Sequence, residues 1–180
     1  MIRKGQTKPL TAPDRAVRLL ARIPGLYPLL AFLTARRVIV RGWSMFPTLA
    51  PEEHVLFDRL TYRLGSPHRG DIVLANHPAR PGLRLVKRLA ALPGDTVAMD
   101  EGHCWVNGSP PGEEPSPGPD EPPGEPRILT DDEYLLLGDA PEFSTDSREL
   151  GPVSRESILA RAWMVYWPPG RMRRIQDEAR

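Results

Sequence analysis

Residues 69–95 read RGDIVLANHPARPGLRLVKRLAALPGD and contain the pattern that decides the fold. Two runs rich in Val, Ile and Leu are bounded by Gly, Pro or Asp, which is typical of short β-strands. The same pattern recurs on both sides, and the predicted strands are 38–40, 55–57, 72–74, 83–92, 96–99, 134–137 and 158–167. The last run is also compatible with a helical start. Because no long helical pattern separates these runs, the sequence predicts an all-β domain of mainly antiparallel, twisted sheets.

A segment of different composition interrupts the predicted strands. Residues 109–126 contain eight prolines among Gly and Glu, so this segment can neither join a sheet nor bury apolar surface. We interpret it as a solvated hairpin loop between strands at 105–107 and 128–129. A length of 180 residues suits one domain with a packed core, which we place at 37–168. Residues 169–180 are expected to form a basic C-terminal tail.

The N-terminal segment, residues 1–36, is basic and amphipathic. The chain up to Arg41 carries nine Lys and Arg against one acidic residue, and arginines recur at helical spacing opposite apolar residues. The sequence therefore predicts a short amphipathic helix. This helix, followed by residues 26–33, either lies in a membrane interface as a shallow anchor or packs on the domain. The apolar run 23–35 is expected not to span a membrane, because it is short and interrupted by proline.

Three blocks carry candidate chemistry. A serine follows a predicted strand in GWSMFPT at 42–48, Lys87 lies inside an apolar run, and hydroxyls and charges crowd GDAPEFSTDSR at 138–148. Taken alone, each block has an ordinary explanation: a serine in a turn, a lysine facing solvent, and a surface ion pair between Asp146 and Arg148. None of the three therefore decides the function by itself.

Taken in order, the blocks resemble the type I signal peptidase family of Ser/Lys proteases. The matching motifs are Ser-Met-x-Pro-Thr at 44–48, Arg-Gly-Asp-Ile-Val at 69–73, Lys-Arg followed by Pro-Gly-Asp at 87–95, and Gly-Asp followed by Ser-x-Asp-Ser-Arg at 138–148. The resemblance implies a signal-peptidase-like fold and a serine endopeptidase that removes leader or signal peptides from preproteins after a small residue. It implies no cofactor.

The same resemblance assigns roles within these motifs. Ser44 is implied as the nucleophile and Lys87 as the general base, with Ser144 hydrogen-bonded to the lysine amine. Asp146 and Arg148 are implied as an ion pair that holds the loop of Ser144. A serine hydroxyl is a poor nucleophile until a base takes its proton, and lysine can act as that base only when its pKa is lowered.

The chain departs from the family pattern at two positions. Gly42 stands where some members carry a serine that donates to the oxyanion, so backbone groups such as the N–H of Ser44 are expected to do so instead. The Gly-Asp motif is usually followed by Asn, whereas Ala140 follows Asp139 here. Asp139 and Gly42 are expected to support the site, as are Ser144, Asp146 and Arg148.

Parts of the sequence are compatible with other functions. The phrases KRLAA and STDSRELGPV look especially like the branch of nickel-type superoxide dismutase maturation peptidases, which suggests one cytoplasmic client as an alternative to membrane-associated export. A third alternative is an inactive peptide-binding module. No nucleic-acid motif is present, and no metal site is expected, because the four histidines do not have zinc-ligand spacing. A Ser-His-Asp triad finds less support than the Ser/Lys pair.

Overall fold

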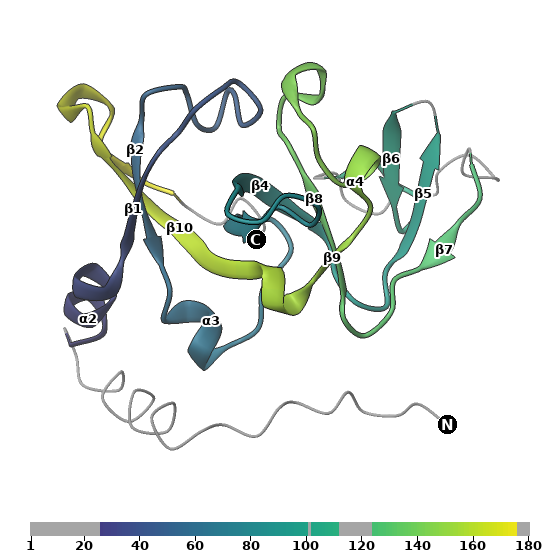
Figure 1. Cartoon of the computed structure of the whole chain (residues 1–180), viewed down its shortest axis with the longest axis horizontal. Helices are drawn as coiled ribbons and strands as arrows, with labels where there is room; N and C mark the ends of the chain where they lie inside the picture. The colour runs from purple at the N-terminus through teal and green to yellow at the C-terminus, as the bar shows by residue number, and fades with distance from the viewer. Residues whose placement is uncertain (1–25, 101, 112–123, 176–180) are drawn as a thin grey trace.

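The computed structural model describes residues 26–100, 102–111 and 124–175, which form two antiparallel sheets (Figure 1). The strands are β1 (Arg36–Ile39), β2 (His54–Asp58), β3 (Ile72–Asn76), β4 (Arg84–Ala91), β5 (Thr96–Asp100), β6 (His103–Val106), β7 (Arg127–Ile128), β8 (Glu133–Leu137), β9 (Val153–Ser154), β10 (Ile158–Trp167) and β11 (Arg173–Arg174). The helices are α2 (Leu26–Thr34), α3 (Thr61–Leu64), α4 (Ser147–Leu150), η1 (Pro141–Phe143), η2 (Arg155–Ser157) and η3 (Pro169–Arg171). The all-β prediction is confirmed, and each predicted strand has its counterpart.

The larger sheet holds eight strands in the order β1-β2-β10-β3-β4-β8-β9, with β11 paired to β10. β10 is strand from its first residue and pairs with both β2 and β3, so it joins the two halves of the sheet. Phe57, Leu74 and Val165 on these strands form one buried cluster. Because inward-facing residues of adjacent strands meet in this cluster, it fixes the strands that surround the candidate site.

The smaller sheet corrects one prediction. Its order is β6-β5-β7, so β5 lies between the two strands that flank the proline-rich segment. These strands were predicted to pair as a hairpin, and that prediction is wrong because both use the edges of β5 instead. The central part of the segment, residues 112–123, lies outside the described residues. A cluster that includes Val97 and Leu135 packs the smaller sheet against β8.

Helix α2 packs on the larger sheet through one side only. Ala31 is fully buried, and the Tyr27 hydroxyl hydrogen-bonds to Asp58 and lies 2.9 Å from Thr61 Oγ1. The large apolar side chains of Leu29, Phe32 and Leu33 remain exposed. The basic amphipathic helix predicted ahead of α2 falls on residues outside those described. Among the described residues, no helix is both long and apolar enough to cross a membrane.

The C-terminal segment takes part in the larger sheet. Strand β11 pairs antiparallel with β10, with Arg173 opposite Val165 and Arg174 opposite Met164. Ile175 donates its backbone N–H to Trp163 O at 3.0 Å and packs against the first core cluster. The packed fold therefore includes residues that the sequence placed in a C-terminal tail.

Candidate active site

Ser44 lies in a tight turn that follows β1. Gly42 has a φ of +82°, a conformation that glycine adopts without steric cost, and it turns the chain out of the strand. The Phe46 N–H donates to Trp43 O at 2.9 Å, and the Leu49 N–H donates to Met45 O at 2.7 Å. Met45 and Leu49 are almost completely buried, whereas Ser44 is only half-buried. Two apolar anchors thus hold a turn that presents a serine near the surface.

Lys87 lies in the middle of β4, opposite Val73 of β3, and is only 3% exposed. The ordinary explanation, a lysine facing solvent, is therefore wrong. Burial lowers the pKa of Lys87 because it disfavours the ammonium form, and the nearby Arg148 lowers it further. The carboxylates of Asp146 and Asp139 oppose this shift without cancelling it. A lysine in this environment can lose its proton at a lower pH than usual.

Ser144 links the lysine to a buried carboxylate. Lys87 Nζ donates to Ser144 Oγ at 2.8 Å, and Ser144 Oγ in turn donates to Asp146 Oδ2 at 2.5 Å. Because an ionised carboxylate can only accept, the single proton of Ser144 points toward Asp146, and Ser144 can only accept from Lys87. When Lys87 is neutral, its lone pair is therefore not used by Ser144 and remains available to another proton donor.

Asp146 is held by several donors. Its side chain is fully buried and accepts from the Gly138 N–H at 2.8 Å, from the Arg148 N–H at 3.1 Å, and from Arg148 Nε and Nη2 at 2.9 and 2.6 Å. Burial alone would raise the pKa of Asp146, but the hydrogen bonds from Arg148, Ser144 and Gly138 outweigh it and lower the pKa. The Asp146–Arg148 pair is therefore not the exposed ion pair of the ordinary explanation.

Gly138 brings the nucleophile turn against the loop of Ser144. A Cβ atom built on Gly138 would lie 2.6 Å from both Ser144 Cβ and Ser44 O, and closer still to Ser144 Oγ. The Ala140 N–H also donates to Ser44 O at 3.1 Å. Because this contact uses only the backbone, the alanine that replaces the family's asparagine preserves it. The backbone of Ser44 and the hydroxyl of Ser144, which is hydrogen-bonded to Lys87, therefore both lie against Gly138.

Substituting Gly138 with alanine is expected to lower kcat at least about ten-fold, because its methyl group would displace Ser144 and the Ser44 backbone from a well-packed geometry. Steady-state kinetics on a peptide substrate would measure the effect. Gly170→Ala is the matched control, since a Cβ at Gly170 meets nothing within 4 Å. Equal kcat values for the two variants would show that this close approach does not matter for turnover.

Arg88, the neighbour of Lys87, is a residue that sequence reasoning did not single out. Its Nε and Nη2 donate to the two carboxylate oxygens of Asp139 at 2.8 Å each, and Nη2 also donates to Thr48 Oγ1 at 3.0 Å. Because successive side chains of a strand point to opposite faces, Arg88 and Lys87 lie on different faces of β4. Two features of the sequence could have identified Arg88: its place on the face of the strand away from Lys87, and the presence of Asp139 in a motif with no basic partner assigned to it. Arg88 connects the strand of the lysine to the nucleophile turn and to the loop of Ser144.

The other two kinds of site considered from the sequence are a metal site and a Ser-His-Asp triad. Within the described parts of the chain, no group of three or more His, Cys, Asp or Glu side chains is placed to hold a metal ion. His54 packs edge-on against the ring of Tyr166, and His77 Nδ1 accepts from the Ala79 N–H at 3.1 Å. The donors on Asp146 are Arg148, Ser144 and backbone N–H groups, so the side chain that a triad would need is already engaged by other residues.

This chain is similar in sequence to signal peptidases of several organisms. Residues 15–167 match the family profile described as Signal peptidase, peptidase S26. The chain is 36% identical over 146 residues to the probable signal peptidase I-2 of Synechocystis, covering 76% of this chain and 65% of that protein. It is 33% identical over 160 residues to the signal peptidase I U of Bacillus subtilis, covering 77% and 79%. A crystal structure of a signal peptidase I from Enterococcus faecalis is 26% identical with a TM-score of 0.40, covering 54% of this chain and 97% of that one. With a family match over most of its length and relatives above 30% identity, this chain belongs to the signal peptidase family, peptidase S26.

Proposed function

We propose that this protein is a serine endopeptidase of the signal peptidase I type, with Ser44 as nucleophile and Lys87 as general base. One observation carries the proposal: the buried amine of Lys87 lies 2.8 Å from a serine hydroxyl whose loop packs against the backbone of Ser44. Membership of the signal peptidase family supports the same chemistry. A buried lysine beside a hydroxyl is also the environment that a Ser/Lys protease needs.

The acylation step uses the lone pair that Ser144 leaves available. Neutral Lys87 takes the proton of Ser44 Oγ as that oxygen forms a bond to the carbonyl carbon of the substrate. The resulting oxyanion is stabilised by backbone donors, of which the N–H of Ser44 is the first candidate because Gly42 offers no side chain. The Lys87 ammonium then gives its proton to the departing amine as the C–N bond breaks. The products are an ester on Ser44 and a free N-terminus.

Deacylation repeats the same proton transfers with water. Lys87, again neutral, removes a proton from a water molecule that attacks the ester carbonyl. When the new intermediate collapses, Ser44 leaves as an alkoxide and takes the proton back from Lys87. The contact with Ser144 holds the amine in place through both steps, because Ser144 only accepts from it. This arrangement returns the enzyme to its starting state.

The proposed substrates are preproteins whose N-terminal leader is cut after a small residue, and the proposed site of action is a membrane surface. Several relatives are named as signal peptidases, and another is a subunit of the mitochondrial inner membrane protease of Xenopus tropicalis. Helix α2 exposes Leu29, Phe32 and Leu33 directly ahead of β1, which leads to the turn of Ser44. Exposed apolar side chains of this kind favour the interfacial region of a bilayer.

Cleavage of a matched pair of preproteins tests the proposed specificity. One preprotein carries alanine directly before the leader junction, and the other carries phenylalanine there. We expect the purified full-length protein to cut only the alanine form, at that junction, because the family resemblance implies cleavage after a small residue. Mass spectrometry of the products locates the cut. Equal cleavage of both forms, or no cleavage of either in detergent micelles, would overturn the proposal.

A further inference from the structure

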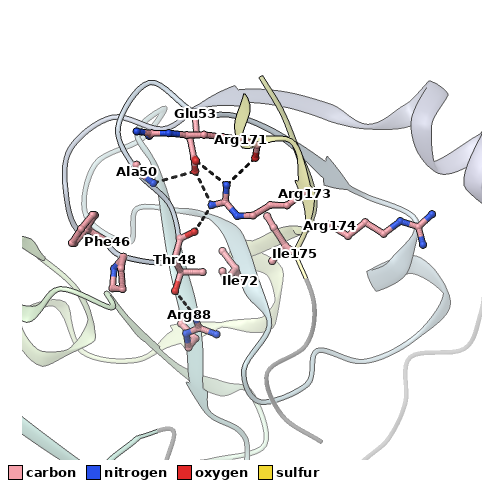
Figure 2. A pocket seen from close by; sticks show the side chains of 11 residues that line it. Phe46, Thr48, Ala50, Glu53, Ile72, Arg88, Arg171, Arg173, Arg174 and Ile175 are labelled. Carbon is pink, nitrogen blue, oxygen red and sulfur yellow. Dashed lines mark hydrogen bonds and ion pairs between the residues drawn. The ribbon is translucent and has the colours of Figure 1, made fainter. Parts of the chain in front are cut away.

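We infer that the C-terminal strand β11 clamps the nucleophile turn, with Arg173 as a positioning residue for Ser44. Arg173 donates to the backbone O of Thr48 at 2.5 Å and to both carboxylate oxygens of Glu53 at 2.8 and 2.9 Å. Figure 2 shows its guanidinium between Glu53 and Thr48. The inference rests on the proposed function, because positioning Ser44 matters only if Ser44 is the nucleophile.

Thr48 is the point where the clamp acts on the turn. Its backbone O accepts from Arg173 of β11, while its hydroxyl accepts from Arg88 of β4 at 3.0 Å. Arg88 directly follows the proposed base in the chain, so these two arginines tie Thr48 both to the strand of Lys87 and to the C-terminal strand. A shift of Thr48 would pass to Ser44 through the short hydrogen-bonded turn between them.

Glu53 makes the clamp rigid. It is only 2% exposed and accepts from the Ala50 N–H at 3.1 Å, so it also binds the end of the turn. Burial opposes ionisation of Glu53, yet the hydrogen bonds from Arg173 and Ala50 lower its pKa, so it is a carboxylate at neutral pH. Its bidentate contact with Arg173 fixes the plane of the guanidinium, and with it the position of the donor to Thr48.

Packing does not replace these polar contacts. An open pocket of about 630 Å³ lies beside these contacts and is lined by residues of both the turn and β11, with Phe46, Ile72 and Ile175 among them. Phe46, on the turn side of this pocket, is 47% exposed, so its packing does not fix the position of the turn. On this side of the turn, the contacts of Arg173 and Arg88 are therefore what hold Thr48 in place. Arg173 itself is fixed because β11 pairs with β10.

The test compares a double variant with a control on the same strand. Removing Arg173 alone would leave a buried carboxylate unpaired and endanger the fold. The double variant Arg173→Met with Glu53→Gln avoids this, because the glutamine oxygen can still accept from Ala50. Arg174→Met is the control: it removes the same charge from β11, and Figure 2 shows the Arg174 side chain pointing away from Glu53 and Thr48.

Two readouts are measured on the full-length chain: steady-state kinetics and hydrogen exchange of residues 45–53. For the double variant we expect kcat to fall at least about ten-fold with KM unchanged, because the turn loses its geometry but not its substrate contacts. Exchange in 45–53 should accelerate, with the thermal midpoint of the protein preserved. The Arg174→Met control should match the wild type in both readouts.

Unchanged exchange in 45–53 would overturn the clamp, even if kcat falls. Unchanged kcat alongside faster exchange would show that the clamp does not position the nucleophile, and would overturn that part of the inference. Failure of the proposed function looks different: Ser44→Ala would then keep its activity, whatever the exchange of the double variant shows. The two ideas are therefore separable in one set of proteins.

Discussion

Substituting Ser44 with alanine is expected to lower kcat on the order of a million-fold, the size of effect seen when a serine protease loses its nucleophile. The substitution removes the only atom proposed to bond to the substrate carbonyl. The fold should be preserved, because Met45 and Leu49 anchor the turn in the core and Ser44 itself is half-buried. The assay is cleavage of the alanine-containing preprotein described above, with circular dichroism to verify the fold.

The matched control for this variant is Ser66→Ala. Ser66 is exposed and lies in the loop between α3 and β3, outside the sequence blocks that contain Ser44, Lys87 and Ser144. This control should cleave at the wild-type rate. If Ser44→Ala retained a comparable rate, the hydroxyl of Ser44 would not be the nucleophile, and the assignment of the site would have to be abandoned.

Substituting Lys87 with methionine is expected to lower kcat/KM at least about a thousand-fold, near the upper range for loss of a general base. Methionine has a similar length and no charge, so it should fill the space of the buried side chain. Asp146 keeps its contacts with Arg148, so no buried charge is left without a partner. Thermal unfolding should therefore give a midpoint at or above that of the wild type.

The pH dependence follows from the direction of the pKa shift of Lys87. Burial lowers this pKa, so the amine becomes neutral at a lower pH than an ordinary lysine. The base is active only when neutral, so kcat/KM should rise with pH through one ionisation below the usual lysine range. Arg84→Met, at the exposed start of the same strand, should keep this profile. A profile in Lys87→Met with the same ionisation and magnitude would contradict the assignment.

The strands were predictable because their signals are local. Runs of Val, Ile and Leu between Gly, Pro and Asp marked most of the sheet. Strand order was not predictable, because pairing depends on contacts between residues far apart in the chain. The placement of β5 between β6 and β7 and the addition of β11 to β10 are both of this kind. A strand of two residues such as β11 carries no periodic pattern at all.

The site was predictable in part. The ordered motifs picked out Ser44, Lys87, Ser144 and the Asp146–Arg148 pair, and the structure brings the last four together. The burial of Lys87 did not follow from its sequence. Strand alternation puts the side chains of Lys87 and Arg88 on different faces of the sheet, but it does not show which face is buried. The contacts of Arg173 could not be anticipated either, since they link residues more than a hundred positions apart. The narrower resemblance to nickel superoxide dismutase maturation peptidases stays a prediction.

The central claim is that Lys87 is a base with a lowered pKa, and a direct titration of its side chain tests it. The chain contains only three lysines, Lys4, Lys8 and Lys87, so labelling lysine with ¹³C at Cε gives a simple NMR spectrum. The Lys87 signal is identified by its absence in Lys87→Met. We predict that it titrates well below the ordinary lysine pKa of about 10.4, at the same midpoint as the rise in kcat/KM. A Lys87 signal that titrates at the ordinary value would contradict the account.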